Sequence, residues 1–218
     1  MNSTTLSSEV ISVIKDVGLY IYPELVEKRV VEKLKEQTLG ILSDRGDTDY
    51  KFGTSVNMGG LNEQCGAIRE FFDTNYFNGL AIQYGTLSAR AVMATHDYRN
   101  DQGTERNGFL HFDRTHTFKF FLYLTDCDES SGAFRYVPDS RELGETLRTQ
   151  ATVDAGGDYK TIANRLEIDY LDLNYTAEDA KPLEGKAGTL FAFDTDTFHM
   201  GGVTQDGKER VVIRSHYV

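Results

Sequence analysis

His111 and Asp113, two residues apart, are the residues of this sequence whose types and spacing best suit metal chemistry. Side chains alternate along a β-strand, so both would point to the same side of one strand. A neutral imidazole beside a carboxylate is a common pair of metal ligands. The pair is not specific alone: with 34 acidic residues and five histidines in 218 residues, chance gives about one such match. Other parts of the chain must supply the remaining ligands.

A distal histidine and a basic final segment complete the candidate site. His199 follows the apolar segment 188–194, and eleven residues later Arg210 opens a segment in which Arg210, Arg214 and His216 share one face. Unpaired charges are costly to bury, so this face predicts a bound anion. Two imidazoles and one carboxylate on one face of an octahedral ion are the arrangement of non-haem Fe(II) oxygenases. The three open positions suit a 2-oxo acid and dioxygen, and a guanidinium suits the acid's far carboxylate.

Composition restricts the class of protein. The chain has 39% hydrophobic residues, with 12 Tyr and 13 Phe, which indicates a folded and β-rich domain. Its formal net charge of -11 disfavours nucleic-acid and membrane partners. The start of the chain lacks the pattern of a secretory signal, and no apolar run is long enough to span a bilayer. Cys65 and Cys127 are too few for a disulfide framework, so we expect a cytoplasmic protein.

The elements that must position the site are predicted to be mainly β with flanking α. We expect one domain over 1–218, helical over 1–79 with a helix at 23–39, and a strand-rich core over 80–218. A polar insert at 141–182, with helices near both ends, is expected to cover a pocket. The predicted strands are 80–84, 88–95, 109–112, 117–125, 133–137, 189–193, 198–203 and 210–217. Many short strands separated by turns predict a sandwich or a barrel-like jelly roll.

Three blocks of sequence resemble one enzyme family. They are His111-Phe112-Asp113, the segment 124–140 with its acidic turn and its Val137-Pro138-Asp139-Ser140 corner, and residues 188–217. These blocks are similar to the Fe(II)/2-oxoglutarate-dependent dioxygenases, specifically the phytanoyl-CoA dioxygenase-like family. The resemblance spans about 88–217 without the insert. It implies a double-stranded β-helix core, a jelly roll of the cupin kind. The N-terminal helices lie outside the resemblance, and we expect them to pack on one side of this core.

The resemblance also implies roles for particular residues. The family's metal ligands match His111, Asp113 and His199. The arginine that binds the co-substrate matches Arg210. Arg214 adds a second cation on the same segment and leaves open which arginine binds 2-oxoglutarate; the spacing favours Arg210, and Arg214 is then expected to face an acid group of the substrate. Asp139 stands where the family usually has Gly, which is expected to alter only a turn.

The implied reaction uses Fe(II), 2-oxoglutarate and O2. Oxidative decarboxylation of 2-oxoglutarate to succinate and CO2 drives hydroxylation of a C–H bond. The carboxylate of Asp113 favours hydroxylation over halogenation and leaves desaturation and ring formation open. Two residues are weaker candidates for substrate contact. A solvated loop is the better interpretation of Arg99, and Tyr123 lies with Lys119 on a strand whose inner face is not evident from the sequence.

The expected substrate is a small polar metabolite, such as an amino acid or a carboxylic acid. A large acyl-CoA would need a basic patch that a chain of net charge -11 does not show. Two alternatives stay open. A cupin-like isomerase or metal-dependent ligand-binding protein would not decarboxylate 2-oxoglutarate and would prefer Zn or Mn. A protein side-chain hydroxylase would need a long open groove. The sequence predicts no oligomeric state.

Overall fold

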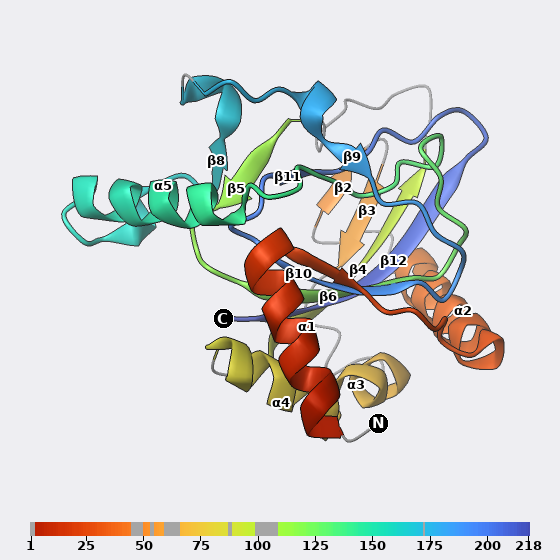
Figure 1. The fold of residues 1–218 in the computed structure, drawn as a ribbon. Helices are drawn as coiled ribbons and strands as arrows, with labels where there is room; N and C mark the ends of the chain where they lie inside the picture. Colours follow the sequence, from red (N-terminus) through yellow and green to blue (C-terminus); the bar gives the residue numbers. More distant parts are fainter. Residues whose placement is uncertain are drawn as a thin grey trace.

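Two antiparallel sheets face each other at the centre of the computed structural model (Figure 1), which describes residues 3–44, 50–52, 55–58, 66–86, 89–98, 109–171 and 173–218. The seven-stranded sheet has the order β1 (Leu19–Ile21), β10 (Leu190–Asp194), β6 (Phe118–Tyr123), β12 (Glu209–Tyr217), β4 (Ala89–Tyr98), β3 (Ser55–Met58) and β2 (Tyr50–Phe52). The five-stranded sheet has the order β8 (Arg165–Glu167), β5 (His111–Asp113), β11 (His199–Met200), β7 (Arg135–Tyr136) and β9 (Lys181–Pro182). The predicted jelly-roll fold with flanking helices is confirmed.

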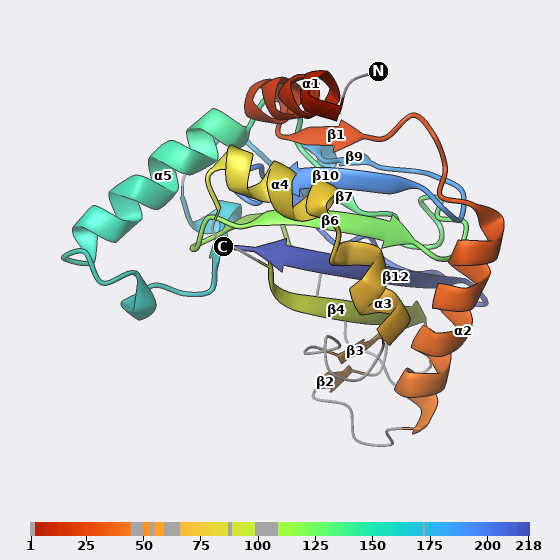
Figure 2. The ribbon, with the colours of Figure 1, turned by 90° about the horizontal axis from the view of Figure 1, so that it is seen from below.

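The four N-terminal helices that the structure describes cover the outer face of the seven-stranded sheet, as expected from the sequence. They are α1 (Ser3–Val17), α2 (Lys28–Asp44), α3 (Gly66–Phe72) and α4 (Asn75–Tyr84). Figure 2 shows α3 and α4 in front of β6, β10 and β12. Their apolar side chains share one core cluster with the outward-facing residues of the sheet. Among the residues that the structure describes, no helix has the length and apolar character needed to cross a membrane.

Alternation along β12 decides which side chains face the other sheet. Val211 and Ile213 pack with the helices, whereas Val212 packs with the aromatic residues between the sheets. The predicted two faces of this strand are therefore confirmed. Because side chains alternate, Arg210 and Arg214 lie on the inner face with Val212.

Two predicted N-terminal elements are wrong. The segment 80–84 is the end of α4 and not a strand, because Thr74 caps the helix start and Gly85 closes it at φ 112°. The predicted helix at 23–39 begins later, at Lys28. Residues 22–26 run beside the start of β10, where the backbone N–H of Val26 donates to the carbonyl of Gly188, 2.9 Å away. This pairing prevents a helix from starting at residue 23. The predicted helical part also contains three short strands, β1, β2 and β3.

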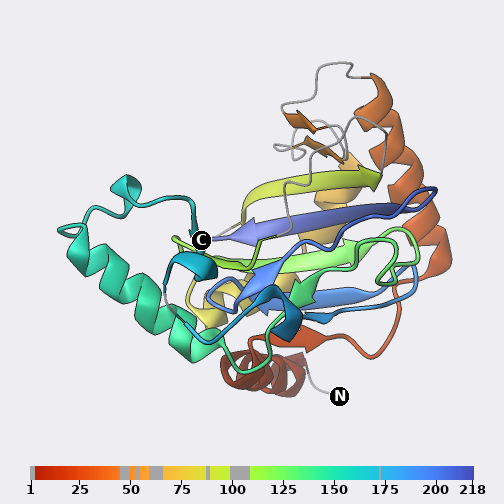
Figure 3. The same ribbon diagram turned by 90° about the horizontal axis from the view of Figure 1, so that it is seen from above.

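The insert at 141–182 contributes to the sheet as well as forming a helix. It begins with α5 (Arg141–Asp154), which Figure 3 shows extending away from the sheets. It then forms both edge strands of the five-stranded sheet, β8 and β9. A short 3-10 helix, η2 (Tyr159–Thr161), lies between α5 and β8, and two more, η3 (Ile168–Tyr170) and η4 (Ala177–Asp179), lie between β8 and β9. The division into one domain with this insert stays a prediction.

Candidate metal centre

The three residues predicted to bind a metal meet in the five-stranded sheet. His111 on β5 and His199 on β11 are direct partners across neighbouring strands, with ring centroids 4.4 Å apart. The Oδ1 atom of Asp113 lies 4.0 Å from Nε2 of His111 and 3.9 Å from Nε2 of His199. One ligand atom from each residue lies within 4.8 Å of the others. The sequence spacing and the strand pairing thus bring together two imidazoles and a carboxylate.

Both imidazoles are held in the tautomer that a metal requires. Nδ1 of His111 lies 2.9 Å from the carbonyl of Phe109, and Nδ1 of His199 lies 2.7 Å from the carbonyl of Thr197. A carbonyl oxygen only accepts, so each Nδ1 carries the hydrogen and each Nε2 presents a lone pair. Burial lowers the pKa of His111 to about 4 and the pKa of His199 well below its usual value. Both rings are therefore neutral near pH 7 and suited to bind a divalent ion.

Lys119 fixes the orientation of the carboxylate. Its Nζ lies 2.6 Å from Oδ2 of Asp113, so only Oδ1 faces the two imidazoles. Burial raises the pKa of the Asp113 carboxyl, but Lys119 and the two imidazoles lower it more, and the net pKa is well below the usual range. Asp113 is therefore ionised and offers one oxygen. Two nitrogens and one oxygen are a donor set that fits Fe(II) on one face of its coordination sphere.

Arg210 is buried on the inner face of the seven-stranded sheet, and its guanidinium is already hydrogen-bonded to Asp97 and Gly132. Its Nε and Nη2 donate to Oδ2 of Asp97 at 2.8 and 2.5 Å, and its Nη1 donates to the carbonyl of Gly132. The charge of Asp97 raises the pKa of Arg210 despite burial, which lowers it. A guanidinium has five N–H groups. Three are engaged by these contacts, so two are left for an incoming carboxylate.

The weaker candidates are placed differently. Arg214 lies over the ring of Phe121, 5.8 Å from its centroid, and its buried Nε has no hydrogen-bond partner among the described residues. The hydroxyl of Tyr123 donates to the carbonyl of Leu183 at 3.0 Å and accepts from the N–H of Phe134 at 3.1 Å, so it links the two sheets. Arg99 lies outside the described residues.

The family departure at Asp139 has a backbone explanation. Asp139 has a φ of 60°, in the left-handed region that favours glycine. Aspartate is among the residues that tolerate this region best. Ser140 then follows, and its hydroxyl accepts a hydrogen bond from the N–H of Phe198 at 2.8 Å. The local change at the turn is consistent with the expectation from sequence.

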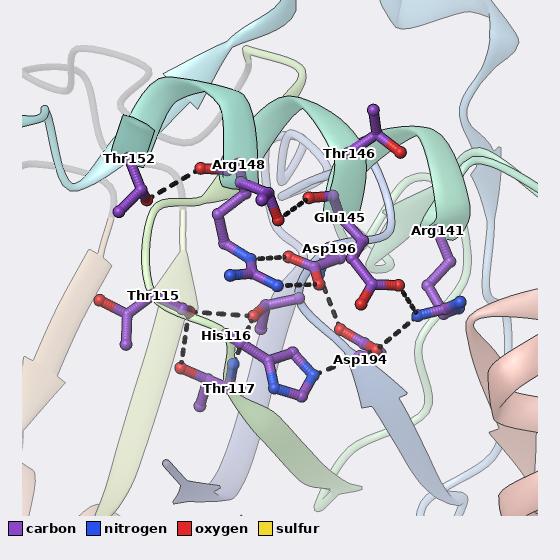
Figure 4. A network of polar contacts seen from close by, with 12 residues as sticks. Thr115, His116, Thr117, Arg141, Glu145, Thr146, Arg148, Thr152, Asp194 and Asp196 are labelled. Carbon is purple, nitrogen blue, oxygen red and sulfur yellow. Dashed lines mark hydrogen bonds and ion pairs between the residues drawn. The ribbon is translucent and has the colours of Figure 1, made fainter. Parts of the chain in front are cut away.

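The sequence predicts a turn before His199, but it did not predict that the aspartates of this turn are buried and paired with basic side chains. Figure 4 shows Asp194 and Asp196, both almost completely buried, surrounded by basic side chains. Arg148 of α5 binds Asp196 through Nε at 2.6 Å and Nη2 at 2.9 Å. Asp194 accepts a hydrogen bond from the hydroxyl of Tyr84 at 2.5 Å. Two basic side chains also lie near its carboxylate, His116 at 3.3 Å and Arg141 at 3.6 Å.

This turn touches two of the candidate ligands through its backbone. The carbonyl of Thr195 accepts from the N–H of Asp113 at 3.1 Å, and the carbonyl of Thr197 accepts from Nδ1 of His199. Helix α5 packs directly on it, because a Cβ on Gly144 would lie 1.8 Å from the carbonyl oxygen of Asp196. We call residues 194–197 the acidic turn. Arg141 and Arg148 are seven residues apart and so lie on one face of a helix, and this spacing is the sequence signal that could have indicated a buried acidic partner.

Comparison with solved structures shows the same fold in proteins of low sequence identity. The epimerase SnoN from nogalamycin biosynthesis, in complex with Fe3+, α-ketoglutarate and nogalamycin RO, has a TM-score of 0.74 at 11% identity, over 99% of this chain and 84% of that chain. The carbocyclase SnoK from nogalamycin biosynthesis gives 0.70 at 15% identity, over 100% and 85%. EctD from S. alaskensis, with 2-oxoglutarate and 5-hydroxyectoine, gives 0.68 at 13%, over 96% and 75%. No curated protein matches the sequence significantly.

The family comparison covers the part of the chain that holds the candidate site. The model of the family "Phytanoyl-CoA dioxygenase (PhyH)" matches residues 95–211, more than half of the chain. The matched region contains the three candidate ligands and Arg210. Fe(II), 2-oxoglutarate and O2 are the cofactor set of this family, so the resemblance seen in the sequence is confirmed. The chain therefore belongs to the phytanoyl-CoA dioxygenase family of Fe(II)- and 2-oxoglutarate-dependent enzymes.

Proposed function

We propose that this enzyme couples oxidative decarboxylation of 2-oxoglutarate to hydroxylation of a C–H bond in a small polar molecule. The observation that carries the proposal is the buried group of His111, Asp113 and His199 with both Nε2 atoms free to bind a metal. We assign these three residues as the Fe(II) ligands. When bound, the iron with 2-oxoglutarate and O2 supplies the oxidising chemistry. The protein holds the ligands in place and keeps water from the buried site.

The proposed anchor for the far carboxylate of 2-oxoglutarate is Arg210. The contacts with Asp97 and Gly132 fix its guanidinium before any ligand arrives, which reduces the entropy lost on binding. The two N–H groups left over can bind one carboxylate. Lys119 completes the arrangement because it prevents Asp113 from binding the metal through both oxygens.

A small substrate is supported by what the similar structures contain. SnoN was solved with nogalamycin RO and EctD with 5-hydroxyectoine. Among the similar structures, SnoN is an epimerase and SnoK is a carbocyclase, so epimerisation and ring formation are alternative reactions at the same type of centre. A cupin-like isomerase without 2-oxoglutarate and a protein side-chain hydroxylase are less well supported, since the matching family is that of phytanoyl-CoA dioxygenase and the similar structures were solved with 2-oxoglutarate and small molecules.

We also propose a cytoplasmic location and a single domain over 1–218. The described cysteine, Cys127, is a buried free thiol, which a reducing compartment preserves. The N-terminal helices share one core cluster with β6 and β12, which supports a single folding unit.

Anaerobic reconstitution with Fe(II) and 2-oxoglutarate tests the proposed centre. The wild type should develop the charge-transfer absorption band of an iron-bound 2-oxo acid, and Asp113→Ala should not. Arg210→Met should need a higher 2-oxoglutarate concentration for the same band. Succinate released on admission of air, in the presence of a metabolite library, then identifies the substrate. If the wild type binds Fe(II) but gives no band with 2-oxoglutarate, the proposed reaction is wrong.

A further inference from the structure

Three basic side chains lie together on the inner face of the seven-stranded sheet beside the proposed metal ligands. The register of β6 and β12 pairs Lys119 with His216 and Phe121 with Arg214. Neighbouring positions on one face of paired strands bring their side chains into contact range. Lys119 reaches Asp113, so this basic group lies next to the centre.

Among the residues that the structure describes, only Lys119 of these three has an ionic partner. Lys119 forms its ion pair with Asp113. Nε of Arg214 and Nε2 of His216 are buried atoms without a hydrogen-bond partner among the described residues. Burial lowers the pKa of Arg214 to about 10, with Asp97 opposing the change, so the guanidinium is still charged near pH 7. Burial keeps the imidazole of His216 neutral by lowering its pKa.

Arg210, four residues earlier on the same face, provides the contrast. The fold gives Arg210 a buried carboxylate, Asp97, and a backbone carbonyl. For Arg214 the described residues provide an aromatic ring and no ion pair. Arg214 is partly buried and its Nε is fully buried, so leaving its charge without an anion is unfavourable. Such a group is retained in proteins where a ligand supplies the missing charge.

A charge count shows which kind of ligand is missing, and it rests on the function proposed above. The two charges of Fe(II) and the one of Lys119 balance the one of Asp113 and the two of 2-oxoglutarate. Arg210 and Asp97 balance each other. Arg165, which also acts on Arg214, is exposed and reached by water. The charge of Arg214 is therefore left over, and it calls for one further negative charge.

We propose that Arg214 binds a carboxylate of the substrate, and that the substrate is therefore a small monocarboxylic acid. A guanidinium presents two parallel N–H groups to a carboxylate. A neutral His216 with its hydrogen on Nε2 can donate one more hydrogen bond to the same group. A phosphate ester carries nearly two negative charges, which is more than the single positive charge of Arg214 would neutralise. Arg214 thus determines specificity by placing the acid end of the substrate beside the metal.

The first test measures stability without any ligand, in two matched variants. Arg214→Met removes a partly buried cation that has no ion pair among the described residues, so the melting temperature of the metal-free protein should rise or stay unchanged. Arg210→Met removes the same group from the same face but leaves Asp97 buried and unpaired, so its melting temperature should fall. A fall in Arg214→Met as large as that in Arg210→Met would mean that Arg214 is structural, and would overturn the proposal.

The second test measures ligand binding with a redox-inactive metal. Protein loaded with Ni(II) should be stabilised by 2-oxoglutarate, which tests the proposed function separately. Propionate added to this complex should bind to the wild type at least tenfold more tightly than to Arg214→Met, whereas propionamide should not distinguish them. Arg214→Lys keeps the positive charge but loses the two parallel N–H groups of the guanidinium, so it should bind propionate with intermediate affinity.

Three results of this binding test would overturn the proposal. In the first, propionate binds equally well to the wild type and to Arg214→Met. In the second, propionate does not bind to the wild type. Alternatively, Arg214→Met could lose stabilisation by 2-oxoglutarate while Arg210→Met keeps it, which would make Arg214 the anchor of the co-substrate. Failure of 2-oxoglutarate to stabilise any nickel-loaded protein would instead contradict the proposed function.

Discussion

Replacement of Arg148 by methionine tests whether α5 holds the metal ligands through the acidic turn. The substitution keeps most of the apolar length of the side chain but removes both hydrogen bonds to Asp196. Asp196 is only 1% exposed, so its carboxylate would be left buried without a cation. The turn that carries Asp196 also supplies the carbonyl of Thr197, which orients His199. We therefore expect effects on stability and on metal affinity together.

The expected magnitude follows from the burial of the ion pair. Loss of one partner of a buried pair costs about 3–5 kcal/mol. The Arg148 side chain is 19% exposed, which lets water reach the site and places the expected loss at the lower end, about 3 kcal/mol. Residues that orient metal ligands typically change metal affinity about 10- to 100-fold. Arg148 does not contact a candidate ligand itself but acts through the turn that carries Asp196, so we expect the lower end of this range, about a tenfold weaker affinity for Ni(II).

Urea unfolding and Ni(II) titration of the purified variant measure the two effects. Lys186→Met is a matched control, because its ion pair with Asp126 is exposed on both sides and should contribute nothing measurable. Arg148→Met combined with Asp196→Asn should recover part of the lost stability, since the uncompensated charge is then gone. If Arg148→Met loses stability but binds Ni(II) as tightly as the wild type, α5 does not position His199.

Three further predictions concern the same contacts. Gly144→Ala should destabilise the protein by about 1–3 kcal/mol in urea unfolding, because its Cβ would overlap the carbonyl of Asp196, and Gly40→Ala, with open space, should not. Tyr123→Phe should cost about 1–3 kcal/mol, since the buried N–H of Phe134 loses its acceptor, without weakening the 2-oxoglutarate band. Burial lowers the pKa of His116, but Asp194 raises it more, so the net pKa is raised. Its stabilising contribution should be complete below about pH 6.5 and disappear as pH rises through the raised pKa. His116→Gln should flatten this part of the pH profile of unfolding, and an unchanged profile would contradict the assignment.

Local patterns predicted the residues of the centre, but not the residues that hold them. The His-x-Asp spacing and the alternation along β12 depend on neighbours in sequence, and both were confirmed by the strand pairing. Arg210 and Asp97 are 113 residues apart, and Arg148 and Asp196 are 48 apart. Such pairs depend on how the sheets and α5 pack, which no local period encodes.

The error at 80–84 has a different cause. A short apolar run fits a strand and a buried helix equally well, and its period alone does not separate them. The signals that settle it are Thr74, which caps the start of α4, and Gly85, which closes its end. Both stand outside the apolar run, so attention to the flanking residues would have given the right element.

The position of β8 beside β5 has a consequence for how the centre opens. Strand β5 lies between β8 and β11, so the backbone around His111 and Asp113 is hydrogen-bonded on both sides and not at a sheet edge. Amide hydrogens in this strand should exchange with solvent slowly, and those that face β8 should exchange only after β8 detaches. A deletion that shortens the insert through β8 would turn β5 into an unprotected edge, and such edges pair with other chains and aggregate.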